Sequence, residues 1–562
     1  MRPRYFKEFP NFSMMPLAYF LFYLFLCPSE SQATSSNVID VPALLEQVRI
    51  LVESLPDEPK SYTLYQELGE LQAKAGRIED AKISLSHIPV GFHQDSLAIK
   101  LKKEIALALA KANEFSGALK VADSIQNFER DYAKEGIAIA MAKSGDIEGA
   151  LAIVESFQEK TRAKKNALIA IGEFQAQRGD LHGGIQIAAQ AGHVSYALWG
   201  IAKEQVKKGH VDEFLKEVQK ISDPLVQEFA LWGVVNAHLD NNQSSAAVQM
   251  AKQIPHGYAS ASAWRDIALV QSEAGSRQAS LSSLELALDG AKAIQNSFAR
   301  SDIYWRIAQG LAMSGDYSKA LQTVDLIEIE GHKHSALRDI VAEVSESGHV
   351  EKALHIAERF NEENAFPSPY WYILRDLAAS GQVSKAMKLV ETGKIQTKEF
   401  SPYDPIALGQ AQMGDSKGAL ETLTNIPRGN DADPRDMYYS LERIARCQIE
   451  NDDLEGAEYT LSKLPGMWRA LAREELAVAF SRKGQIEKAK KTLASISDTE
   501  AKGKALQKFS RVLAIQGDWY EALTWANSMS SPYLKAKVLL GVVRAKLESP
   551  AEKTLGLVGM KN

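Results

Sequence analysis

Tryptophan and arginine recur at regular intervals in the middle third of this 562-residue sequence. Successive positions carry Trp199, Trp232, Arg265, Trp305, Arg338 and Trp371, at intervals of 33 residues apart from a single interval of 40. An indole offers a flat apolar surface and one hydrogen-bond donor, and a guanidinium is a planar cation that stacks on rings and pairs with carboxylates. Such a row suits a peptide with aromatic or acidic side chains, or a sugar chain that stacks its apolar faces on indole.

No catalytic or metal-binding signature accompanies this row. The sequence contains no P-loop, GxSxG, HExxH or CxxC pattern. His332 and His334 have a metal-like spacing without an evident third ligand, and the acids of NDADPRD lack the glycine and distal Glu of a calcium loop. We therefore predict that the chain is not an enzyme and holds no cofactor or metal, and that residues 430–436 form a solvated acidic loop.

The row belongs to a longer repeat, which is marked by fourteen residues that we call the turn residues. Eleven of them are Gly and three are Asn or Asp, the residue types that tolerate the left-handed backbone at the end of a helix. Their mean interval is near 34 residues, which is typical of a repeat architecture. The turn residues are Gly76, Asn113, Gly145, Gly179, Gly209, Asn242, Gly275, Gly315, Gly348, Gly381, Gly414, Asp452, Gly484 and Gly517.

The residues around each turn residue predict a helix on either side of it. The position eight residues before it is apolar in all fourteen repeats, and the position five residues after it is Ala in eleven. An Asp that can cap the following helix comes directly after the turn residue in six repeats. The unit is therefore a helix A, a tight turn and a helix B, and no sustained alternation of period two indicates β-structure.

These units predict an all-α fold, an α-α superhelix of about fourteen helix-turn-helix repeats with a period of 33–34 residues, over residues 57–547. A helical pair cannot bury its apolar face alone, so each unit packs on its neighbours. The 40-residue interval between Gly275 and Gly315 predicts a lengthened helix B over residues 281–295. The 38-residue interval contains the segment Pro427–Asp436, which we expect to be an exposed loop.

The pair Ile307–Ala308, the turn Gly315–Asp316–Tyr317 and the following Ala320 resemble the tetratricopeptide repeat (TPR) family. The resemblance covers roughly residues 57–547, nearly the whole mature chain, and together with the leader described below it predicts an exported, bacterial-type member. It departs at the end of helix B, where the family's Pro is often absent or early, as at Pro89 and Pro255, so that helix B is expected to be short there. In this family the position ten residues before the turn faces the concave groove. The resemblance therefore implies a ladder of Trp and Arg along the inner surface of the middle repeats.

The two ends of the chain carry other signals. Basic residues, the apolar run Leu17–Cys27 and the small Ala33 predict a secretory signal peptide over residues 1–33, with an uncleaved anchor as the alternative. We expect the mature chain to have no transmembrane span and to be periplasmic or extracellular. Residues 41–56 predict an N-terminal capping helix, and residues 548–562 a C-terminal tail or partial repeat. After cleavage Cys447 is the only cysteine, which excludes an internal disulfide, and we expect it to be a small packing residue.

The charge also bears on the partner. The net charge is -6, and the leader contributes +1 from three basic residues against Glu8 and Glu30, which leaves -7 for the mature part. This balance argues against nucleic acid as a partner. We predict an exported TPR-like scaffold that binds a protein or peptide along its concave helix-A surface. The alternatives are that the ladder only packs repeat against repeat, that it binds an envelope polysaccharide, and that the chain is a muramidase-like enzyme, which no distinctive acid supports.

Overall fold

The computed structural model describes residues 39–89, 91, 94–126, 128–157, 161–191, 194–359, 368–395, 401–424 and 434–548. These residues form thirty α-helices and include no strand, so the predicted all-α solenoid of helix-turn-helix repeats is confirmed. Within the same ranges, no helix combines the length and the apolar character that crossing a membrane requires.

Fourteen helical pairs follow one another along the chain, and we number the repeats 1–14 in this order. The A helices are α3 (Pro59–Lys74), α5 (Gln94–Lys111), α7 (Glu129–Ser144), α9 (Arg162–Gln177), α11 (Val194–Lys208), α13 (Pro224–Asp240), α15 (Tyr258–Glu273), α17 (Ser297–Met313), α19 (Glu330–Glu346), α21 (Pro369–Ala379), α23 (Tyr403–Gln412), α25 (Pro434–Glu450), α27 (Gly466–Arg482) and α29 (Thr499–Gln516). The B helices are α4 (Ile78–Ser86), α6 (Phe115–Asp123), α8 (Ile147–Glu155), α10 (Leu181–Ala189), α12 (Val211–Gln219), α14 (Ser244–Ala251), α16 (Arg277–Lys292), α18 (Tyr317–Asp325), α20 (Val350–Ala357), α22 (Val383–Glu391), α24 (Ser416–Thr424), α26 (Leu454–Ser462), α28 (Ile486–Ala494) and α30 (Trp519–Ser528). Two further helices, α2 (Val41–Glu53) and α31 (Pro532–Glu548), lie before and after these pairs.

The turn residues have the backbone that their types predict. All fourteen have a positive φ, including Asn113, Asn242 and Asp452 at 64°, 59° and 63°. The following Asp caps helix B in five of the six repeats that have one, as where Asp316 accepts a hydrogen bond from the Lys319 amide at 3.0 Å. Asp518 is the exception, since it makes no side-chain capping bond.

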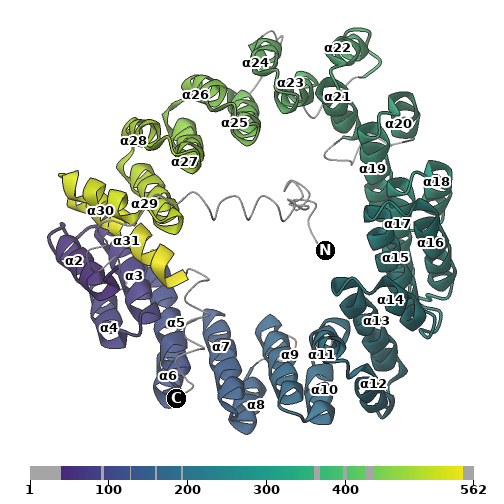
Figure 1. Ribbon diagram of the computed structural model, residues 1–562, viewed down its shortest axis with the longest axis horizontal. Coiled ribbons are helices and arrows are strands. Elements are labelled where there is room, and N and C mark those ends of the chain that lie inside the picture. Colours follow the sequence, from purple (N-terminus) through teal and green to yellow (C-terminus); the bar gives the residue numbers. More distant parts are fainter. Residues whose placement is uncertain are drawn as a thin grey trace, which may run out of the picture. The chain divides into compact units, whose positions relative to one another are not determined.

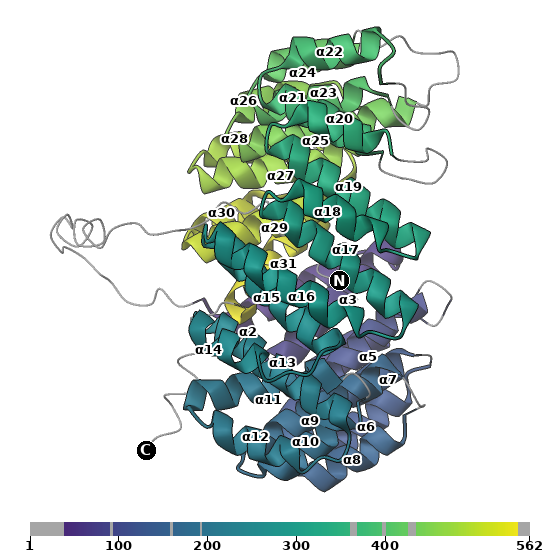
Figure 2. The same cartoon turned by 90° about the vertical axis from the view of Figure 1, so that its right-hand side faces the viewer.

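The core lies between the helices of each pair and between neighbouring pairs. All fourteen apolar residues at the position eight before the turn residue are at most 2% exposed, and the Ala of helix B that follows the turn by five residues is fully buried wherever it occurs. Small side chains there let helix B approach helix A closely. The A helices pack on one another along the inside of the curve and the B helices lie outside (Figures 1 and 2).

Helix lengths depart from the common pattern in a few places. Helix α16 has 16 residues, as its long repeat predicts, whereas the other B helices have 8–10, so a short helix B does not depend on an early Pro. Helices α21 and α23 have only 11 and 10 residues. The predicted exposed loop Pro427–Asp436 is wrong at its end, because α25 already begins at Pro434, whose fixed φ suits the first turn of a helix.

The last helix of the described solenoid packs against its first two helices. Helix α31 packs against α29 on one side and against α2 and α3 on the other (Figure 1). It contacts α3 as one A helix contacts the next, and it contacts α2 as an A helix contacts its own helix B. Helices α31 and α2 thus form a fifteenth repeat, made from the two ends of the chain. The helix predicted to cap the N-terminal end of the stack, α2, packs on both α3 and α31.

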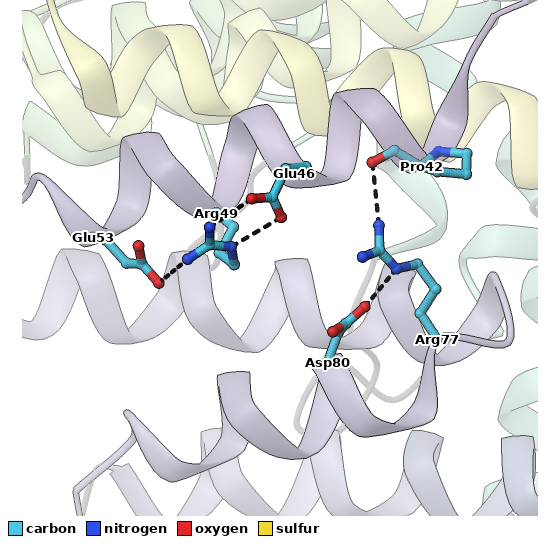
Figure 3. Close-up of polar contacts among 6 residues, drawn as sticks. All are labelled: Pro42, Glu46, Arg49, Glu53, Arg77 and Asp80. Atoms are coloured by element: carbon cyan, nitrogen blue, oxygen red, sulfur yellow. Dashed lines mark hydrogen bonds and ion pairs between the residues drawn. The ribbon is translucent and has the colours of Figure 1, made fainter.

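We call the contact of α31 with α2 and α3 the seam. Leu44, Leu45, Val48 and Val52 of α2 are buried there. Arg77, in the turn of repeat 1, pairs with Asp80 and donates a hydrogen bond to the Pro42 carbonyl at 3.2 Å, which ties the start of α2 to that repeat (Figure 3). Arg49 bridges Glu46 and Glu53 along α2 (Figure 3).

Several predictions fall outside the described residues. They are the signal peptide over residues 1–33, most of the acidic loop over residues 430–436, and all of the C-terminal tail except Glu548. Cys447 lies half-buried on α25.

Candidate ligand-binding surface

Each A helix leaves one stripe partly open, on the side away from its helix B. In α17 the side chains of Trp305, Arg306 and Gln309 are half-buried, whereas Ile307 and Ala308 are fully buried. We call this stripe the inner face. All six predicted site residues, Trp199, Trp232, Arg265, Trp305, Arg338 and Trp371, lie at the same position of it and are half-buried.

The first part of the row is a three-residue unit that joins repeats 6 and 7. Trp232 donates from Nε1 to Asp266 Oδ2 at 2.9 Å, and Arg265 NH2 lies 3.1 Å from Asp266 Oδ1. The rings of Phe229 and Tyr258 flank the indole, with centroids 6.0 and 6.2 Å away. One carboxylate therefore fixes an indole of its neighbour and a guanidinium of its own repeat, and we call this unit a triad.

The same triad recurs two repeats later. Trp305 Nε1 donates to Asp339 Oδ2 at 3.1 Å, and Arg338 NH2 lies 3.6 Å from Asp339 Oδ1. His332 stacks on this indole, with ring centroids 5.7 Å apart. Neither Arg265 nor Arg338 stacks on an indole in the described structure. In these four repeats an Asp links Trp and Arg instead, through a hydrogen bond from the indole and an ion pair with the guanidinium.

The ends of the row differ because the next repeat offers no acceptor. The triads use an Asp nine residues before the turn, and that position is Gly233 after Trp199 and Pro405 after Trp371. Trp199 Nε1 is consequently buried without a hydrogen-bond partner, and Lys203 Nζ lies 6.0 Å from the centre of its ring. No described residue accepts a hydrogen bond from Trp371 Nε1.

Trp371 has two guanidinium groups over its ring instead. Arg375, one turn further along α21, lies 5.3 Å from the ring centroid, and Arg443 of repeat 12 lies 4.9 Å from it. These distances are in the range of cation–π contacts. Arg443 spans one repeat to reach Trp371, and the intervening helix A, α23, begins only at Tyr403 and so lacks the first turns that other A helices have.

The charges around Trp371 leave one cation unpaired. Arg375 donates from Nε to Asp376 Oδ1 at 2.6 Å, and burial raises the pKa of Asp376 despite this partner. Arg446 pairs with Glu442 at 2.9 Å and with Glu475 at 3.2 Å. Arg443 is exposed, and no carboxylate of the described residues pairs with it.

Carboxyl groups with raised pKa values are spread over several repeats of the described chain. Burial raises the pKa values of Glu70, Glu135, Glu173, Glu228 and Asp376, which lie in five different repeats, and the charge of Glu104 adds to the rise at Glu70. His334 pairs with Glu330 at 3.2 Å. Within the described ranges, no three His, Cys, Asp or Glu side chains converge as a metal site would require.

Sequence reasoning missed the partners that decide what each indole does. The signal was available for the triads, because Asp266 and Asp339 follow Arg265 and Arg338 directly. Arg443 lies outside the six consecutive repeats of the row, and no local pattern connects it with a Trp two repeats earlier. Its contact depends on the short α23.

Comparison with protein-family profiles and with curated protein sequences finds no match. Among solved structures, the pentatricopeptide repeat protein PPR10 from maize is 14% identical, with 93% of this chain and 89% of that chain covered and a TM-score of 0.27. Ton1535 from Thermococcus onnurineus NA1 is 17% identical over 54% of this chain and 96% of its own, with a TM-score of 0.21. A circular tandem repeat protein is 14% identical over 92% and 100%, with a TM-score of 0.12. All three TM-scores are low, so the fold class rests on the helices and turns described above.

Proposed function

We propose that this chain is an exported helical-repeat scaffold whose inner face binds a protein or peptide segment. The observation that carries the proposal is the row itself, which places Trp or Arg on the same half-exposed stripe of six successive A helices. Trp and Arg dominate the energetic hot spots of protein interfaces. Export is proposed from the leader pattern of residues 1–33.

The triads support this proposal by pre-organising the surface. An Asp that holds both an indole and a guanidinium fixes two long side chains before any partner arrives. Side chains that are already ordered lose less entropy on binding. The half-exposed faces of Trp232 and Trp305 are thus presented in a fixed register, one every second repeat.

The row therefore has two kinds of position. Trp232 and Trp305 use their N–H groups within the protein, so replacing them should weaken the joint between repeats as well as binding. Trp371 makes no such bond, so its replacement should weaken binding more than it weakens the fold.

The experiment is selection of displayed peptides on immobilised mature chain, residues 34–562, followed by binding measurements with three variants. We expect peptides to be enriched, Trp371→Ala to reduce their binding with a smaller fall in melting temperature than the other two variants, and Trp232→Ala and Trp305→Ala to reduce both. Enrichment of no peptide, combined with retention of a neutral oligosaccharide on a glycan array or of single-stranded RNA, would contradict a peptide-binding function. If Trp→Ala changes lower the melting temperature while the selected peptides still bind, the row is only packing.

A further inference from the structure

The end of the row at repeats 10–12 combines an indole N–H with an exposed guanidinium, and neither has a hydrogen-bond partner among the described residues. Trp371 Nε1 has no acceptor among the described residues, and the exposed guanidinium of Arg443 lies over the same ring without a carboxylate partner. We propose that this place, the Trp371–Arg443 site, binds a carboxylate of the partner, so that the scaffold recognises an acidic peptide segment. The inference rests on the proposed function and specifies its chemistry.

The charge balance around the site supports a carboxylate. Acids on the two helices that supply the donors are already engaged, Asp376 by Arg375 at 2.6 Å and Glu442 by Arg446 at 2.9 Å. A ligand carboxylate would complete for Trp371 and Arg443 the arrangement that Asp339 makes with Trp305 and Arg338. In both triads one carboxylate accepts from an indole N–H and faces an Arg. The site has the same two donors and lacks the acid, because Pro405 stands where the triads have Asp.

The surroundings indicate a peptide rather than a small acid. Tyr372 lies edge-on to Trp371 with centroids 5.4 Å apart, and Arg375 also covers the Tyr372 ring at 5.4 Å. Tyr439, on the same helix as Arg443, is 53% exposed and packs its ring edge-on against Trp468. Aromatic surface therefore lies on both helices that supply the donors, α21 and α25. A segment that alternates acidic and aromatic or apolar side chains fits this combination better than an isolated carboxylate.

The test compares three short synthetic peptides that are fluorescein-labelled and acetylated. The first alternates Glu and Tyr and ends in an amide, the second replaces every Glu by Gln, and the third keeps Gln but has a free C-terminal carboxylate. Binding is followed by anisotropy, and fluorine NMR of protein labelled with fluorotryptophan reports on Trp371, whose signal is assigned with Trp371→Phe. We expect the Glu peptide to bind and to shift the Trp371 signal, and its affinity to fall as salt rises from ~0.05 to ~0.3 M. Binding of the third peptide but not the first would show that the site takes a chain terminus rather than side-chain acids.

Matched variants separate the site from general electrostatics. Arg443→Gln should weaken the binding of the Glu peptide by about tenfold or more, as expected for a charged hydrogen bond. Arg446→Gln removes the same charge from the same helix but from an Arg that already has partners, and should weaken binding by about twofold or less. Equal losses from the two variants, or equal affinity for the Glu and Gln peptides, would overturn the inference. If none of the three peptides binds while the displayed library still yields ligands that need Trp371, the inference of a carboxylate-binding site is wrong, but the proposed peptide-binding function is retained. If the library yields none either, both proposals fail.

Discussion

The seam and the row are both places where polar side chains join neighbouring repeats, but they are buried to different depths. In the row, Trp232 and Trp305 reach an Asp 34 residues further along the chain, and their rings remain half-exposed. In the seam, Lys537 Nζ lies 2.7 Å from Glu67 Oε1, and the Lys537 side chain is only 1% exposed. A buried ion pair that loses one member leaves a charge without solvent or partner. Polar substitutions should therefore cost most at the seam.

The seam also carries more ion pairs than the joints inside the row. Gln507 donates to the second oxygen of Glu67 at 2.9 Å, Lys74 pairs with Glu548 at 3.4 Å, and Arg544 lies 3.9 Å from Glu70. These contacts fix the register in which the last helix A meets the first. The buried apolar side chains of α2 stabilise the seam, and the ion pairs determine how α31 is positioned on α3. The comparison therefore predicts that the ends of the chain, which are the weakest part of an open solenoid, are here held as firmly as its middle.

The largest effect should come from removing α2. Deleting residues 41–53 takes away four buried side chains, each worth at least about 1.5 kcal/mol, and exposes the outer side of α31. We expect amide hydrogen exchange in α31 and α29 to accelerate by several orders of magnitude, while α15 and α17 keep their protection, since a solenoid opens locally. Exchange measured by mass spectrometry tests this.

Moving α2 provides the matched control. A chain that starts at residue 54 and carries Ser-Gly-Asp followed by residues 41–53 after Glu548 copies the turn Ser314–Gly315–Asp316. If α31 and α2 are one repeat, this chain should regain the protection of α31. Continued fast exchange would show that α2 is needed as part of the N-terminal pair and not as the helix B of α31.

The next effect in size is the loss of the buried cation. Lys537→Met leaves Glu67, which is 16% exposed, with only Gln507 as partner, and should cost about 3 kcal/mol in the local free energy of opening. Lys508→Met is the control, because Lys508 pairs with Glu474 at 2.8 Å between ordinary neighbours but is 52% exposed, and should cost less than about 1 kcal/mol. Adding Glu67→Gln to Lys537→Met should recover most of the loss. A single variant as mild as Lys508→Met would mean that the seam is solvated like the rest of the surface.

The helix-turn-helix pattern of each repeat was predictable from the sequence, whereas the packing of α31 on α2 was not. A left-handed turn and a buried apolar residue are local requirements, and the types at positions such as Asn113 and Ile307 state them directly. The joining of α31 to α2 depends on the small rotation between successive repeats summed over the whole chain, which no residue encodes alone. Only the spacing of Leu44 and Val48 hinted at it, because it matches Ala320 and Val324 of an ordinary helix B.

The candidate site, like the fold, was predictable only in part. The shared phase of the row identified six side chains that do lie on one face. What each of them does depends on the next repeat, where Asp, Gly or Pro stands opposite the indole. A rule that pairs the Trp position of one repeat with the Asp position of the next would have shown that Trp305 has an acceptor and Trp371 has none. The approach of Arg443 would still have been missed, since it follows from the ten-residue length of α23.

A smaller effect separates the two kinds of Trp within the row. Trp305→Phe removes the hydrogen bond to Asp339, a buried carboxylate, and should cost about 1–2 kcal/mol. Trp371→Phe removes the same indole from the same position but no internal hydrogen bond, and should cost about 0.5 kcal/mol or less. Urea unfolding of both variants gives the difference. Equal costs would mean that the bond to Asp339 contributes no more than ring packing.

The smallest effect concerns a carboxylate that, unlike Glu67, has no partner to hold it. Glu173 of repeat 4 lies against Gly200, with Oε1 1.5 Å from where a Cβ would be, and no described residue donates a hydrogen bond to it. Burial alone raises its pKa, so the folded chain holds this proton more tightly than the unfolded chain does. The fold is therefore favoured at acidic pH, loses stability as pH rises from the unfolded towards the folded pKa, and changes no further above it. Glu173→Gln should remove that dependence and raise stability at neutral pH by ~0.5 kcal/mol, whereas Glu67→Gln, which deprives Lys537 of its counter-charge, should lower it. Melting temperatures across the acidic range test both signs, and a Glu173→Gln variant that melts lower than the parent at neutral pH would mean that this carboxylate has a stabilising partner after all.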